Sequence, residues 1–217
     1  LRLSVEPRHI ECFDNSNIQG TNPVAACVVF RDVMLAVKDY RHFNIKTVSG
    51  PNDFASMEEV VFRRYKRMLD EGHALPQLII IDGGKGQLSS AIKSLKELGL
   101  TDKIAVIGIA KRLEEIYYPN DPIPLYLDKK SESLKVIQRL RNEAHRFGLS
   151  HHRNIRSKAA IQNEIVSISG IGEKTTLKLL KEFKSVKRLK MLSLDEIIQA
   201  IGKDKGNKVF HYYHNID

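Results

Sequence analysis

A short apolar run that ends on an aspartate and two glycines is the feature that most constrains the fold of this chain. Residues 76–87 read Pro-Gln-Leu-Ile-Ile-Ile-Asp-Gly-Gly-Lys-Gly-Gln. A run as short as Leu78–Ile81, bounded by a proline and glycines, is typical of a strand that is buried on both faces of a sheet. Because α/β proteins bind their ligands at the carboxyl ends of such strands, Asp82 is expected to be a functional carboxylate.

A second strand with the same kind of ending is predicted near the start of the chain. Residues 8–14 alternate polar and apolar side chains, which puts Ile10, Cys12 and Asp14 on one face, and turn-forming residues follow. If the two strands pair, Asp14 and Asp82 become neighbours, and two close carboxylates favour a cation between them. Mg²⁺ or Mn²⁺ fits this position, because both bind carboxylate oxygens and leave sites open for phosphate and water.

The remaining hydrophobic pattern predicts an α/β fold with a mixed sheet. Strands are expected at 8–14, 24–31, 39–46, 78–81, 104–109 and 125–127, and helices at 53–71, 87–98 and 132–147. The first helix has an apolar stripe at spacings of three and four, made of Phe54, Met57, Val61, Tyr65, Met68 and Leu69. Asp53 is expected to be the N-cap of this helix.

The helix expected at 132–147 carries a third candidate for the site, His145. Its core stripe is predicted to be Leu134, Ile137, Leu140, Ala144 and Phe147. At 100° per residue, His145 falls on the border of this stripe. A neutral imidazole there could complete a two-carboxylate metal site or move a proton during phosphodiester hydrolysis. A half-buried, hydrogen-bonded structural histidine is the alternative.

The positive charge of the chain is concentrated in its carboxy-terminal part. The net charge is +9, and residues 135–217 carry 17 of the 35 basic but only 8 of the 26 acidic residues. Such an asymmetry indicates a polyanionic partner, most simply nucleic acid, although a solvated basic helix face has the same composition. The candidates for holding a DNA backbone are Lys111, Arg139, Arg141 and Arg146.

Length and composition predict a soluble, cytoplasmic protein. The chain has 217 residues, of which 42% are hydrophobic, enough for one good core and a small second one. No apolar run approaches the roughly 20 residues of a membrane span, and no signal peptide is visible at the start. Cys12 and Cys27 both lie in strand-like apolar surroundings, so we expect reduced core residues.

A separate helical unit is predicted for residues 158–217, after a first domain at 1–157. The sequence around Gly170-Ile171-Gly172 has the pattern of a helix-hairpin-helix, whose backbone N–H groups can bind a DNA phosphate. A second copy at 197–203 has alanine in place of the first glycine. A hairpin pair that serves only packing is the alternative. The DNA-binding candidates are Gly170, Gly172, Lys174, Gly202 and Lys203.

Four motifs together resemble the carboxy-terminal half of UvrC, the incision subunit of bacterial nucleotide excision repair. They are Glu11-Cys12-Phe13-Asp14-Asn15-Ser16, Gly50-Pro51-Asn52-Asp53-Phe54-Ala55-Ser56-Met57, Ile81-Asp82-Gly83-Gly84-Lys85-Gly86-Gln87 and Asn142-Glu143-Ala144-His145-Arg146-Phe147. They occur in the family's order and the similarity covers essentially the whole chain. The resemblance implies a ribonuclease-H-like endonuclease domain followed by a tandem helix-hairpin-helix domain.

The resemblance also implies the site and its partners. It maps a catalytic and metal-binding Asp-Asp-His triad onto Asp14, Asp82 and His145, with Mg²⁺ or Mn²⁺ as cofactor, and gives the position of Asp53 a part in the same reaction. It implies incision of damaged double-stranded DNA on the 5′ side of the lesion, and a UvrB contact made mainly through a segment that this chain lacks. Where the family usually has a glycine- and lysine-containing turn, this chain has Val33–Val37.

Two other functions compete with this interpretation. One is a nucleotide-binding domain in which Gly83–Gly86 holds phosphate, but a P-loop needs four residues between its glycines and Ser or Thr after the lysine. The other is a DNA-binding scaffold without catalytic activity, in which the aspartates only cap turns.

Overall fold

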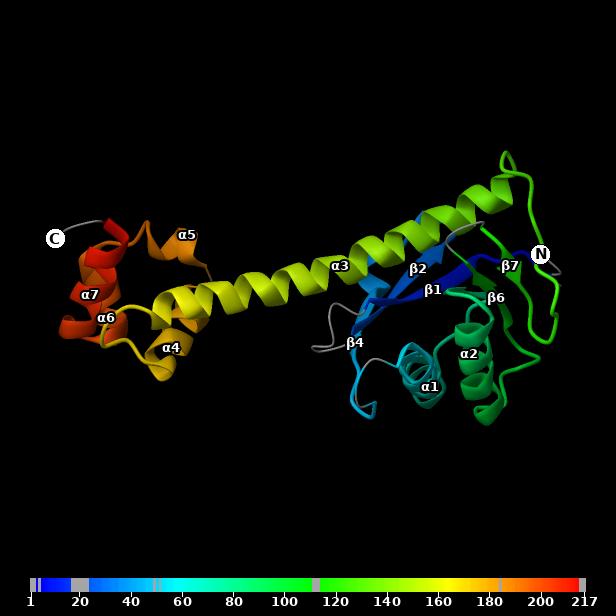
Figure 1. Ribbon diagram of the computed structural model, residues 1–217, viewed down its shortest axis with the longest axis horizontal. Coiled ribbons are helices and arrows are strands. Elements are labelled where there is room, and N and C mark those ends of the chain that lie inside the picture. Colours follow the sequence, from blue (N-terminus) through cyan, green and yellow to red (C-terminus); the bar gives the residue numbers. More distant parts are fainter. Residues whose placement is uncertain are drawn as a thin grey trace. The chain divides into compact units, whose positions relative to one another are not determined.

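The computed structural model describes residues 3, 5–16, 24–48, 50, 52–110, 114–183 and 185–214, without the side chains of 152–159. The chain divides into two compact units, Leu1–His151 and His152–Asp217 (Figure 1). The predicted boundary lies after residue 157. Among the described residues, no helix combines the length and apolar character that a membrane crossing requires.

The first unit is built on a mixed sheet. Its strands are β1 (His9–Ser16), β2 (Val24–Arg31), β3 (Met34–Leu35), β4 (Arg41–Asn44), β5 (Leu78–Asp82), β6 (Ala105–Ile109) and β7 (Ile116–Tyr117). They are arranged in the order β3-β2-β1-β5-β6-β7, and β4 also pairs with β2. The central strands β1, β5 and β6 are parallel, whereas the outer pairings are antiparallel. Every residue of β5 is buried, as expected for a strand covered on both faces.

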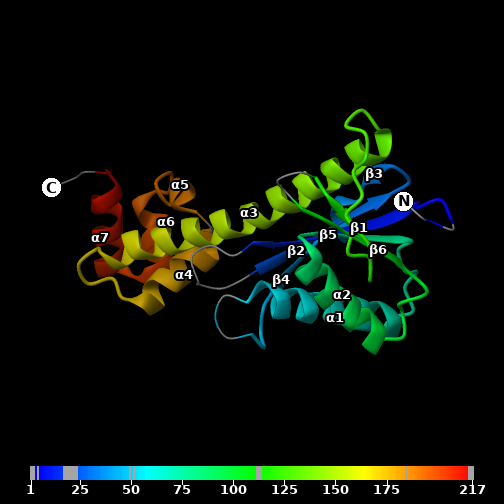
Figure 2. The ribbon, with the colours of Figure 1, turned by 45° about the vertical axis from the view of Figure 1, so that its right-hand side comes forward.

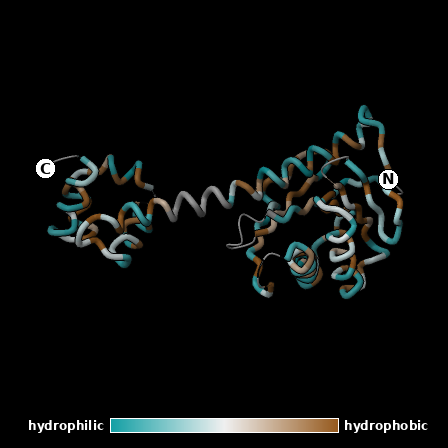
Figure 3. Tube along the Cα trace, in the orientation of Figure 1, coloured by the Kyte–Doolittle hydropathy of each residue, from teal (hydrophilic) through white to brown (hydrophobic). Residues whose placement is uncertain are grey.

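Helices cover both faces of this sheet. In Figures 1 and 2, α1 (Asp53–Asp70) and α2 (Lys85–Glu97) lie on one face, and the first part of α3 (Glu132–Val166) lies on the other. A short 3₁₀ helix, Val37–Asp39, precedes β4. Hydrophobic residues, brown in Figure 3, gather along the central strands. Cys12 and Cys27 are both free and buried in this core, which confirms the prediction for them.

Several predicted element boundaries were wrong. The helix at 132–147 continues to Val166, because a single glycine at 148 costs a helix only about 1 kcal/mol and no proline follows it. The strand predicted at 39–46 is present but shorter, as β4 at Arg41–Asn44, because the 3₁₀ helix extends to Asp39. The two-residue strand β3 was not predicted. The strand expected at 125–127 is an isolated bridge from Leu125 to Ile116, a residue of β7, which the sequence analysis missed.

The ends of α1 also differ from the prediction. Asn52, rather than Asp53, is the N-cap, and its side chain accepts a hydrogen bond of 3.1 Å from the amide of Ala55. Phe54 and Leu69, predicted to belong to the buried stripe, are 56% and 41% exposed. They lie in the first and last turns of the helix. The other four members of the stripe are buried as predicted.

A buried charge network holds α1 against the sheet. Glu11 of β1 is fully buried, and its carboxylate accepts hydrogen bonds from the Arg64 guanidinium at 2.6 and 3.1 Å and from the Tyr65 hydroxyl at 3.0 Å. The His9 ring lies 3.1 Å from the same carboxylate. Burial alone would raise the pKa of Glu11, but the hydrogen bonds from His9 and Arg64 and the Arg64 charge together lower it to about 2.

The hairpin between β2 and β3 contains a strained residue. Arg31 pairs with Met34, so the connection has only two residues, Asp32 and Val33, with φ of 47° and 68°. Positive φ at both positions is the geometry of a type I′ turn, which favours Asn-Gly. A β-branched residue in this region is strained by about 1–3 kcal/mol. The chain therefore forms this hairpin at a conformational cost.

The second unit is all-helical. Besides the end of α3 it contains α4 (Glu173–Phe183), α5 (Val186–Leu189), α6 (Leu194–Ile201) and α7 (Lys203–His214). Its small core is formed by Ile165, Ile168, Ile171, Leu179, Leu189, Ile197 and Val209.

We expect Val33→Gly to stabilise the first unit by about 1 kcal/mol, because glycine adopts positive φ without strain. Thermal unfolding followed by circular dichroism should show a higher midpoint. Val37→Gly is the matched control, since Val37 is also exposed but lies outside the positive-φ turn. A lower midpoint for Val33→Gly would show that the turn is not strained.

We expect Glu11→Gln to lower the free energy of unfolding at pH 7 by about 3 kcal/mol, because it leaves Arg64 buried beside a neutral group. Since the pKa of Glu11 in the folded protein is about 2, below its ordinary 4.5, this stabilisation is present above pH 4.5 and lost as the pH falls toward 2. Urea unfolding should therefore show the two proteins converging over that range. Glu71→Gln, which removes an exposed ion pair with Arg67, should change little.

Candidate metal centre

The register of β1 and β5 brings the two predicted carboxylates together. The strands run parallel, with Phe13 opposite Ile81 as their last paired residues. Asp14 and Asp82 follow directly, so their side chains leave the same face of the sheet at the carboxyl ends of neighbouring strands. Asp14 is 1% exposed and Asp82 is 4% exposed. Two nearly buried carboxylates thus lie side by side at the edge where α/β folds bind ligands.

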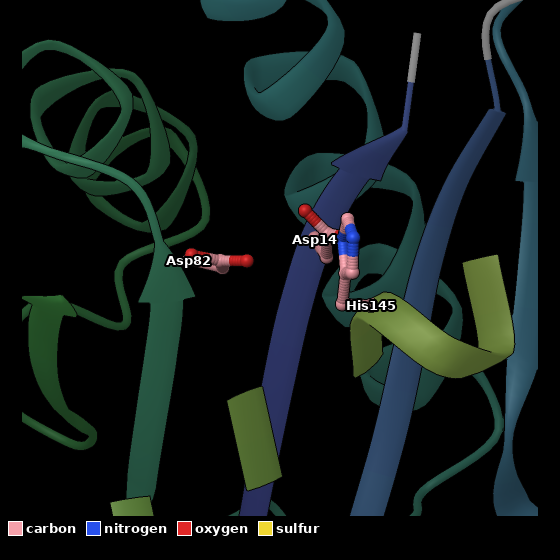
Figure 4. A group of neighbouring side chains, drawn as sticks. All are labelled: Asp14, Asp82 and His145. Atoms are coloured by element: carbon pink, nitrogen blue, oxygen red, sulfur yellow. The ribbon is translucent and has the colours of Figure 1, made fainter. Parts of the chain in front are cut away.

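His145 reaches the same place from α3, on the face of the sheet opposite α1. Its Nδ1 lies 3.0 Å from Oδ2 of Asp14, and its side chain is 46% exposed. Figure 4 shows the three side chains, from β1, β5 and α3, turned toward one another. One possible ligand atom from each lies within 4.8 Å of the others. Two carboxylates and an imidazole are a donor set that Mg²⁺ or Mn²⁺ accepts, so these residues fit the implied metal.

The thiol of Cys12 lies on the same face of β1 as Asp14 and is completely buried. Burial raises the pKa of Cys12 well above its usual value, and the negative charges of Asp82 and Asp14 raise it further. The thiol therefore stays protonated and neutral beneath the two carboxylates.

A close approach between backbones fixes the turn that follows Asp82. The amide of Gly83 donates a hydrogen bond of 3.0 Å to the carbonyl of Ile109 in β6. A Cβ at position 108 would lie 2.9 Å from the carbonyl oxygen of Gly83, so only glycine fits there without a shift. The Lys85 ammonium donates to the carbonyl of Pro122 at 2.6 Å, which ties the start of α2 to the loop after β7. Because the Lys85 ammonium binds a backbone carbonyl, its position gives no support to the alternative in which Gly83–Gly86 holds a nucleotide phosphate.

Asp53 lies outside the group of three donors, as the exposed first residue of α1. It is nevertheless linked to the site, because the side-chain amide of Asn15 donates a hydrogen bond of 2.7 Å to the Asp53 carbonyl. Asn15 directly follows Asp14, so the start of α1 is attached to the end of β1. A catalytic role for Asp53 stays a prediction.

The structure separates the basic candidates of the first unit by their surroundings. Arg139 is exposed, with its guanidinium 5.3 Å from the centre of the Phe30 ring. Arg141 is 14% exposed and lies 3.5 Å from the Glu114 carboxylate. Arg146 makes two hydrogen bonds of 2.7 Å to Glu143. A DNA phosphate that binds Arg141 or Arg146 would therefore bind a guanidinium that already contacts a carboxylate. Lys111 lies outside the described residues.

The two hairpin copies of the second unit differ in geometry. Gly170 has φ of +83° between α3 and α4, and Gly202 has φ of +86° between α6 and α7. In the first copy the positive φ falls on the first glycine of the motif, whereas in the second it falls on the last. The difference follows from Ala200, which takes the place of the first glycine in the second copy. Ala200 continues α6, so the helix ends one residue later, after Ile201, and the positive φ falls on Gly202. Gly172, Lys174 and Lys203 are exposed.

Three features of the structure were not predicted from the sequence. Glu114 binds Gln138 at 2.5 Å and lies beside Arg141, although nothing in its local pattern separates it from any loop glutamate. Asn15 was included only as a turn residue. Phe54 was assigned to the core by its spacing, and its exposure follows from tertiary structure alone.

Residues 1–149 match the family model described as the UvrC RNAse H endonuclease domain, which covers well over half of the chain. The chain belongs to the UvrC family. Its mixed sheet with helices on both faces is accordingly the ribonuclease-H-like nuclease fold that the sequence motifs predicted.

Relatives in the UvrC family match this chain along its entire sequence. The UvrABC system protein C of Flavobacterium psychrophilum is 71% identical over 217 residues, which are 100% of this chain and 36% of that protein. The protein of the same name from Porphyromonas gingivalis is 58% identical over 97% of this chain and 35% of its own length. The chain therefore spans about a third of these relatives.

Among solved structures, Endonuclease V of Ciona intestinalis, in complex with a 24mer DNA containing an inosine followed by a ribo-adenosine, aligns with a TM-score of 0.36 and 20% identity. The alignment covers 64% of this chain and 57% of that one. The sequence relationship alone establishes the family.

We expect Gly108→Ala to lower the free energy of unfolding by about 1–3 kcal/mol, because the new methyl group would press on the Gly83 carbonyl and disturb the turn after Asp82. Gly84→Ala is the matched control, since Gly84 has φ of −81° and open space around its Cβ position. Equal unfolding midpoints for the two variants in urea would contradict the close approach.

Proposed function

We propose that this chain is the part of a UvrC protein that cuts damaged double-stranded DNA on the 5′ side of a lesion in nucleotide excision repair, using Mg²⁺ or Mn²⁺. The observation that carries the proposal is the group of Asp14, Asp82 and His145, whose ligand atoms lie within 4.8 Å of one another. Membership of the UvrC family gives the reaction class. The setting is the bacterial cytoplasm, with the other components of the UvrABC system, UvrB among them, as partners.

Each residue of the centre has a distinct part in the proposed hydrolysis. Asp14 and Asp82 would hold the divalent ion between neighbouring strand ends. When bound, such an ion polarises the scissile phosphate and lowers the pKa of an attacking water. His145 keeps its ring oriented through the contact between Nδ1 and Asp14, while its partly exposed side chain can accept a proton from water or complete the coordination.

The basic residues supply DNA binding without base recognition. Arg139 and Arg146 are exposed on the helix that also carries His145, so phosphates held there lie along the same element as the metal centre. Lys111 remains a proposed contact outside the described residues. In the second unit, the turns at Gly170-Ile171-Gly172 and Gly202, with Lys174 and Lys203, are proposed to bind phosphates as a tandem helix-hairpin-helix domain at 158–217.

We expect Asp14→Asn, Asp82→Asn and His145→Ala each to slow incision of a lesion-bearing duplex by about 100-fold or more, because each removes a ligand or proton acceptor. The assay is single-turnover nicking with this chain and the other UvrABC components. Chelation with EDTA should abolish cutting by the unaltered chain, and Mg²⁺ or Mn²⁺ should restore it.

Asp70→Asn is the matched control, because Asp70 is an exposed aspartate that pairs with Lys66 on α1. All four variants should bind DNA as well as the unaltered chain. If the three site variants cut normally, the triad assignment is wrong. If the unaltered chain binds but never cuts with any divalent metal, the scaffold alternative holds instead.

A further inference from the structure

An exposed aromatic ring lies at the start of α1, near the carboxyl edge of the sheet. Phe54, in the first turn of α1, is 56% exposed and is the one phenylalanine among the described residues with an exposed side chain. Exposure of so large an apolar group is unfavourable by itself, since burying a phenylalanine side chain is worth about 1.5–3 kcal/mol. The ring is therefore a candidate for contact with something outside this chain.

The ring is held in place by the backbone of α2. A Cβ at position 86 would lie 2.8 Å from Cζ of Phe54, so the ring occupies the space that the glycine leaves free. Gly86 is in the first turn of α2, where alanine would be the better helix former. One side of the Phe54 ring is thus packed against a fixed surface, and the rest of the ring stays open to solvent.

Short connections link this ring to both catalytic aspartates. Asp53, directly before Phe54, accepts a hydrogen bond through its carbonyl from Asn15, directly after Asp14. On the other side the ring packs on Gly86, four residues after Asp82. The ring therefore lies between the starts of α1 and α2, at the carboxyl edge of the sheet. His145 approaches the carboxylates from the opposite face of the sheet.

Under the proposed function, the scissile phosphate binds through the metal at Asp14 and Asp82, and a neighbouring base of that strand would come within reach of this edge. Aromatic side chains bind such bases by stacking, without regard to sequence, because every base has a flat apolar face. A repair nuclease that must cut any sequence needs a contact of this kind rather than base-edge hydrogen bonds. Other exposed aromatic rings have local partners: Tyr126 donates its hydroxyl to Glu115, and Tyr212 packs on Tyr213.

We propose that Phe54 is a stacking platform for a base next to the cleaved phosphate, so that it positions the strand in the metal centre. This rests on the nuclease function proposed above.

The test compares aromatic and aliphatic replacements in the single-turnover incision assay. Phe54→Leu should slow incision roughly 5- to 150-fold, the range expected for the loss of one stacked base. Phe54→Tyr should keep most of the rate, because it retains an aromatic ring of the same size. Leu69→Ala, which changes the other exposed apolar residue of α1, is the matched control and should cut normally. Thermal unfolding of all variants checks that α1 remains folded.

A second arm places the ring against a particular base. An abasic analogue is introduced at each nucleotide beside the cut in turn. At one position it should slow the unaltered chain by the same factor as Phe54→Leu, and it should cause no further loss in that variant. Equal incision rates for Phe54→Leu and Phe54→Tyr would overturn the stacking proposal. It would also be overturned if, at every position, the abasic analogue slowed Phe54→Leu by the same factor as it slows the unaltered chain. If the unaltered chain does not cut at all, the nuclease function itself has failed.

Discussion

The parallel pairing of β1 with β5 sets Phe13 opposite Ile81, and every part of the candidate metal centre depends on this register. A slip of one residue would turn Asp14 to the opposite face of the sheet and bury an unpaired carboxylate against α1. The register is fixed by the apolar residues that precede the aspartates on both strands, because they fill the core on both faces. The chemistry at the strand ends is therefore a consequence of core packing several residues away.

The two faces of β1 have different tasks. Asp14 faces the side that carries His145, whereas Glu11 faces α1 and binds Arg64 and Tyr65. The buried ion pair orients α1, and the start of α1 is attached again through Asn15. Because α1 is fixed at two points, Asp53 and Phe54 have defined positions relative to the strand ends. A buried ion pair adds little net stability on its own, but removing one partner is costly, which makes the arrangement rigid.

The central strands, the meeting of Asp14 with Asp82 at two strand ends and the buried stripe of α3 were predictable, since each depends on a local pattern of burial or on a strand ending in aspartate. The position of His145 beside them depended on the family resemblance, because the helical period alone placed it only at the border of that stripe. The strain at Val33 was not predictable, because the register of β2 with β3 determines its φ and the local sequence does not favour that turn. The length of α3 was missed for a related reason. One glycine is a weak helix breaker, and the helix continues because nothing after it stops the hydrogen-bond ladder. Phe54 matched the helical period, but exposure is a property of the assembled fold.

The thiol of Cys12 lies beneath Asp14 and Asp82 without adding charge to the centre. Burial and the two neighbouring carboxylates raise its pKa well above the usual value, so the sulfur stays protonated. The thiolate, not the thiol, is the form that binds metals, and Mg²⁺ and Mn²⁺ prefer oxygen ligands to sulfur. Under the proposed function, a buried sulfur directly beneath the ion would therefore not compete with the carboxylate oxygens for it.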